Sequence, residues 1–103
     1  MPLREEITDL LGKPENGDEA PSLDAIESTL TDGYAEALAL EAKRVRIERR
    51  LGEVAREAED VTNVREFARL SACLESADGE LMRLRSLLRN LQARRRFALA
   101  SRS

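Results

Sequence analysis

The chemistry that this sequence offers most plainly is the binding of anions by arginine. Fifteen of the 17 cationic residues are Arg, and residues 81–103 hold seven arginines and no acidic residue. A guanidinium makes paired hydrogen bonds to carboxylates and phosphates, so this end could bind nucleic acid or an acidic membrane surface. The candidate anion-binding residues are Arg89, Arg94, Arg95 and Arg96.

Two features argue against a nucleic acid or a membrane surface as the partner. The arginines are not interleaved with aromatic side chains on which bases could stack. Residues 22–42 carry five acidic residues and no cation, and a pairing of this stretch with the arginine-rich end would neutralise part of the charge. Anion binding is therefore the alternative function, and solvated helix faces are the simpler interpretation of the charge.

Other site chemistry is limited by the composition of the 103-residue chain. It has no histidine, which removes the usual general base and the commonest metal ligand. The single cysteine, Cys73, excludes an internal disulfide and a metal site made by a cysteine pair. The glycines are isolated, so no phosphate-binding loop is expected. We expect no metal, no cofactor and no enzymatic activity.

The same features bear on the compartment. One unpaired cysteine fits a reducing environment. The sequence has no run of about 20 apolar residues that could span a membrane, and the first residues are too acidic for a signal peptide. We therefore expect a cytoplasmic protein.

The elements that would position the arginines are two long helices. From Leu23 to Ala58, apolar residues recur in steps of three and four, with Arg44 as the one charged interruption, and a second such series runs from Phe67 to Ala98. This spacing is typical of helices that pack along one face, as in coiled coils. The sequence therefore predicts an all-α fold.

The predicted organisation has two parts. Residues 1–21 form a short helix over 2–12 and an acidic, flexible linker over 13–21. Residues 22–103 form a helical hairpin, with one helix over about 22–58, a turn over about 59–63 and a second helix over about 64–100. Ser22 suits the N-cap of the first long helix, and Asn63 followed by Glu66 resembles a capping box for the second.

The two series of apolar residues match when the helices are paired antiparallel. One register brings small residues against large ones, Gly33 against Leu88 and Ala37 against Leu84. The two Asp-Gly pairs, at 32–33 and 78–79, interrupt neither series, so we predict that both helices continue through them.

Several apolar residues lie outside this seam and widen the apolar face beyond what two helices can bury. The candidate interface residues are Tyr34, Leu38, Val45, Met82 and Leu87. A second copy could cover them and form a homodimeric four-helix bundle, or the helix over 2–12 could fold back onto them. An unidentified protein partner is a further possibility. We expect a homodimer that acts through protein–protein interaction.

Two families resemble this outline. The small helical-hairpin secretion substrates are similar in length and arrangement, although their Trp-x-Gly turn is replaced by residues 59–63, Glu-Asp-Val-Thr-Asn. Residues 23–55 resemble the all-α chorismate mutases in an Asp after a Leu and in the Arg-Arg-Leu-Gly stretch at 49–52. Glu53 stands where that family has lysine, and the second half lacks the family's pattern. The second resemblance implies a small all-α enzyme as the alternative to a non-enzymatic protein.

Overall fold

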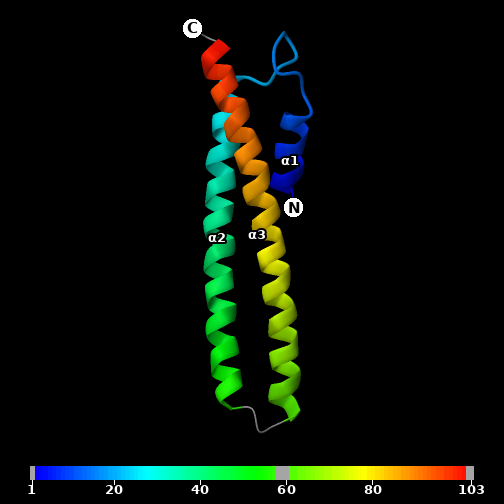
Figure 1. Cartoon of the computed structure of the whole chain (residues 1–103), viewed down its shortest axis with the longest axis vertical. Coiled ribbons are helices and arrows are strands. Elements are labelled where there is room, and N and C mark those ends of the chain that lie inside the picture. The colour runs from blue at the N-terminus through cyan, green and yellow to red at the C-terminus, as the bar shows by residue number, and fades with distance from the viewer. Residues whose placement is uncertain (1, 58–60, 102–103) are drawn as a thin grey trace. The chain divides into compact units, whose positions relative to one another are not determined.

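The structure is a computed structural model that describes residues 2–57 and 61–101, apart from the side chains of residues 61 and 62. Its elements are three helices, α1 (Pro2–Leu11), α2 (Leu23–Arg56) and α3 (Val61–Ser101) (Figure 1). No strand occurs in the described residues, so the predicted all-α class is confirmed. Both long helices continue through their Asp-Gly pairs, as the unbroken apolar spacing predicted.

The helix ends differ in part from those predicted. The Ser22 side chain accepts a hydrogen bond from the backbone N–H of Ala25 at 3.1 Å, which confirms the predicted N-cap of α2. The predicted turn at 59–63 lies partly outside the described residues, and its described end, 61–63, belongs to α3. Asn63 is therefore no N-cap, and the predicted capping box is wrong. Its side-chain amide instead donates to the carbonyl of Glu57, just beyond the end of α2.

The chain divides into two compact units. Unit 1 comprises Met1–Ala37 and Arg83–Ser103, and unit 2 comprises Leu38–Met82. Helices α2 and α3 contribute to both units, whereas α1 belongs to unit 1 alone. No helix among the described residues is long and apolar enough to cross a membrane.

Unit 1 has an apolar core to which all three helices contribute. The helix over 2–11 buries two side chains on one face, and the apolar spacing of α2 and α3 supplies the rest. The buried residues are Ile7, Leu10, Ile26, Leu30, Ala37, Leu84, Leu88 and Leu91. The predicted pairing of Gly33 with Leu88 is confirmed, because Leu88 occupies the space beside Gly33 that a side chain would need.

Arg94 holds the C-terminal end of α1 in unit 1. Its guanidinium donates hydrogen bonds to the carbonyl of Leu11 at 2.7 Å, of Lys13 at 2.8 Å and of Pro14 at 3.2 Å. Carbonyls at a helix C-terminus lack intrahelical donors and carry partial negative charge. An arginine there supplies both hydrogen-bond donors and a compensating positive charge. A helix of ten residues is marginal alone, and these contacts explain why α1 lies against α3 (Figure 1).

Unit 2 is built from parts of α2 and α3 only and has a thinner core. Its buried apolar residues are Leu40, Val54, Leu70, Ala77 and Leu81. Phe67 was predicted to begin the apolar seam of the second long helix, yet 44% of its surface is exposed. A pair of helices buries one stripe of each, and the described residues of unit 2 include no third helix.

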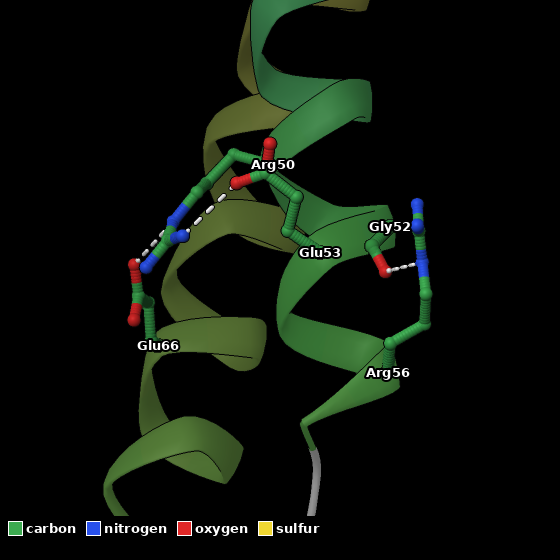
Figure 2. Close-up of polar contacts among 5 residues, drawn as sticks. All are labelled: Arg50, Gly52, Glu53, Arg56 and Glu66. Atoms are coloured by element: carbon green, nitrogen blue, oxygen red, sulfur yellow. Dashed lines mark hydrogen bonds and ion pairs between the residues drawn. The ribbon is translucent and has the colours of Figure 1, made fainter.

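Ion pairs join the two helices of unit 2. Arg50 on α2 contacts Glu53 on the same helix and Glu66 on α3, each at 3.0 Å (Figure 2). The hydrogen bond that Arg50 donates to Glu66, and then the one it donates to Glu53, raise the pKa of Arg50 above its ordinary value. Near the end of α2, Arg56 donates to the carbonyl of Gly52 at 3.1 Å (Figure 2).

Candidate protein interface

Three large apolar side chains of unit 2 are exposed on one side of its helix pair. Leu38 and Val45 lie seven residues apart on α2, nearly two helical turns, and therefore share a face. Met82 lies on α3. Their exposed fractions are 66% for Leu38, 50% for Val45 and 71% for Met82. We call these three residues the Leu38 surface.

A cluster of charges shows that the three residues share one side. Arg44 on α2 contacts Glu48 at 3.0 Å and Asp78 of α3 at 3.1 Å. Glu48 follows Val45 by three residues, and Asp78 precedes Met82 by four residues, so each carboxylate neighbours that apolar residue on its helix surface. The bridge from Glu48 through Arg44 to Asp78 therefore runs along the side of the pair that bears Val45 and Met82.

The same cluster explains the charged interruption in the α2 seam. The Nε–H of Arg44 donates to Glu48, which leaves the buried Oδ1 of Asp78 with an ionic contact but no hydrogen bond. The hydrogen bond that Arg44 donates to Glu48, and then the charge of Asp78, raise the pKa of Arg44 above its ordinary value. Arg44 therefore lies along the edge of the seam and stays charged.

The other two predicted interface residues lie in unit 1, in different surroundings. Tyr34 is half exposed, and its hydroxyl accepts a hydrogen bond from the Gln92 amide at 3.3 Å. Leu87 is partly buried and lines a hollow of about 560 Å³ with α1 residues, including Arg4 and Thr8. The helix over 2–11 therefore lies beside Leu87, whereas the fold-back alternative expected it to cover the whole set, and Leu38, Val45 and Met82 are exposed.

Sequence reasoning missed two exposed apolar residues of unit 2. Val64 and Phe67 lie three residues apart near the start of α3, and 60% of Val64 is exposed. Phe67 was assigned to the seam because its spacing from Leu70 and Leu74 fits it. The same spacing places Val64 beside Phe67 on the helix surface, which is the signal that could have identified the pair.

The four candidate anion-binding arginines divide into two groups. Arg94 is engaged at the end of α1, and Arg95 forms an ion pair with Glu27 of α2 at 3.2 Å. Arg89 and Arg96 are exposed and have no ion-pair partner within the described residues. The predicted cluster therefore retains two guanidinium groups for an external anion, and these lie two turns apart on α3.

No other chemical site is evident in the described residues. In the ranges 2–57 and 61–101, no group of three or more His, Cys, Asp or Glu side chains is placed to hold a metal ion. Cys73 is an exposed free thiol. Comparisons of the chain with protein-family models, with curated proteins and with solved structures found no match.

Proposed function

We propose that this chain is a non-enzymatic, cytoplasmic helical-hairpin protein that acts through protein–protein contact and whose partner is a second copy of itself. The Leu38 surface is the interface, and two hairpins together form a four-helix bundle. The observation that carries the proposal is the high exposure of Leu38 and Met82 beside a thin two-helix core.

The contacts between α2 and α3 support an antiparallel hairpin in each unit. In unit 1, Glu27 pairs with Arg95 and Tyr34 with Gln92. In unit 2, Arg44 pairs with Asp78 and Arg50 with Glu66. In both units the partner on α3 moves toward the N-terminus as the residue on α2 moves toward the C-terminus, which is the order expected of an antiparallel pair.

The energetics favour a covered surface in unit 2. Burying apolar area contributes about 25 cal/mol per Å², and a large side chain contributes about 1.5–3 kcal/mol when it is fully buried. Leu38, Val45 and Met82 forgo most of that contribution in the isolated chain. A two-fold dimer is the commonest closed assembly, and it would bury these three residues on both of its chains.

The test is the substitution Leu38→Glu, measured by sedimentation of the full chain. We expect the dimer to dissociate and the thermal unfolding midpoint to fall, because folding and association are linked. Ala39→Glu is the matched control, since Ala39 is also exposed, is the adjacent residue and receives the same charge on another face of α2. Equal dimerisation of Leu38→Glu and the native chain would refute the assigned interface.

A further inference from the structure

Two exposed apolar residues near the start of α3 lie on the side of unit 2 that bears the Leu38 surface. Val64 precedes Met82 by 18 residues, which is about five turns of an α-helix, so both lie on one face of α3. Phe67 precedes Asp78 by 11 residues, about three turns, and the ion pair of Asp78 with α2 marks the same side. We call Val64 and Phe67 the Val64 pair.

The two sides of the helix pair in unit 2 differ in character. Arg50 follows Arg44 by six residues, about one and two-thirds turns, and therefore lies at the opposite edge of the seam. That edge is charged, because Arg50 contacts Glu66 of α3. The large apolar side chains that are exposed in the described part of unit 2 all belong to the other side, and they are Leu38, Val45, Val64, Phe67 and Met82.

An interface made by the Leu38 surface alone would be small. A large apolar side chain contributes about 1.5–3 kcal/mol on burial at about 25 cal/mol per Å², so three of them supply roughly 200–350 Å². A specific dimer of standard size buries about 800 Å² on each partner. The Val64 pair adds apolar area on the same side, and Val64 lies about 27 Å along α3 from Met82. The area that a stable dimer needs therefore favours a contact that includes the pair.

We infer that the second copy covers unit 2 along its length, so that the Val64 pair is buried in the interface together with the Leu38 surface. This inference rests on the proposed homodimer and extends its contact. The side has apolar residues toward both ends and the ion pairs of Arg44 between them. A two-fold related copy carries the same arrangement, so apolar ends face apolar ends in either direction along the helices.

Val64→Glu tests the inference by sedimentation of the full chain. A carboxylate buried in an apolar contact is costly, so the variant should dimerise at least about tenfold more weakly than the native chain. Cys73→Glu is the matched control, because Cys73 is exposed and lies nine residues from Val64, about two and a half turns, on the opposite face of α3. The control should dimerise as the native chain does.

Thiol labelling gives a readout that introduces no charge into the interface. In a Cys73→Ser background, Val64→Cys should react with a soluble thiol reagent at least about tenfold more slowly in the dimer than in the monomer, because a packed interface excludes water. Adding Leu38→Glu to this chain supplies the rate of the monomer. In the native sequence, the thiol of Cys73 should react at one rate in both states, since it lies on the opposite face.

The outcomes separate this inference from the proposed function. A dimer that Val64→Glu leaves unchanged, or in which Val64→Cys is labelled as fast as in the monomer, would overturn the extended contact and leave the homodimer standing. A native chain that stays monomeric would overturn both.

Discussion

The side chain of Leu88 packs directly against the backbone of Gly33 in unit 1. A Cβ placed on Gly33 would overlap Leu88 Cδ2 and lie 3.4 Å from Leu88 Cγ. Glycine is an unfavourable residue in the middle of a helix, costing about 1 kcal/mol relative to alanine. Its presence in α2 is explained by this close approach of the two helices.

The first prediction is that Gly33→Ala destabilises the chain despite the better helix propensity of alanine. Overpacking in a core costs about 1–3 kcal/mol, which should outweigh the propensity gain of about 1 kcal/mol and leave a net loss of up to about 2 kcal/mol in the free energy of unfolding. Urea denaturation measures the change. In a Leu88→Ala background the obstructing atoms are gone, so the same substitution should be neutral or stabilising.

Gly52→Ala is the control for this prediction. A Cβ at Gly52 would meet only the flexible end of Arg56, at 3.4 Å, so alanine should raise the free energy of unfolding by up to about 1 kcal/mol. If the two glycine substitutions had equal effects, the close approach of Gly33 and Leu88 would not be the reason for a glycine at position 33.

The second prediction concerns the attachment of α1. Arg94→Ala removes the donors to the carbonyl of Leu11, at the end of α1, and to two carbonyls just beyond it, and a hydrogen bond to a charged group contributes about 1.5–3 kcal/mol. Amide hydrogen exchange in residues 5–11 should accelerate at least about tenfold. Arg96→Ala, at an exposed arginine two residues away, should leave exchange in α1 unchanged.

The third prediction is a stability that is flat in pH across the neutral range. Hydrogen bonds donated to Glu48 and Glu66 raise the pKa values of Arg44 and Arg50, respectively. A cation whose pKa is raised by folding contributes stability that is fully present below the ordinary arginine pKa. This stability is lost only as the pH rises through the higher pKa of the folded chain. The chain also has no histidine.

The urea midpoint should therefore stay constant between about pH 6 and pH 8. Measurement in one buffer series at fixed ionic strength and fixed protein concentration checks this. A midpoint that shifts clearly within that range would show that a group outside these arginine pairs titrates on unfolding.

The fourth prediction is weak binding of polyanions. Arg94 and Arg95 are engaged within unit 1, which leaves Arg89 and Arg96 of the candidate set for an external anion. We expect dissociation constants no tighter than about 10⁻⁴ M for duplex DNA at physiological salt. Low-micromolar binding that weakens steeply with salt would establish the alternative function.

The sequence predicted the helices well because their signals are local and repeated. The apolar spacing located α2 and α3 and the contact of Gly33 with Leu88, and Ser22 marked the start of α2. The sequence also placed the acidic stretch 22–42 against the arginine-rich end, and the ion pair of Glu27 with Arg95 joins these two stretches.

The surroundings of single side chains were less predictable, because they depend on tertiary contacts. Arg94 looked like an exposed cation until α1 presented its carbonyls to it. Leu87 has the same apolar character as Leu38, but Leu87 lines a hollow with residues of α1, whereas Leu38 is exposed. Asn63 followed by Glu66 fits the pattern of a helix start, but α3 begins two residues earlier, and Glu66 pairs with Arg50 instead.

The central claim is self-association, and sedimentation equilibrium of the full-length chain tests it most directly. At about 50 µM we predict a mass of about twice the 11.5 kDa chain, decreasing toward the monomer value on dilution as mass action requires. A single species with the monomer mass at that concentration would contradict the account.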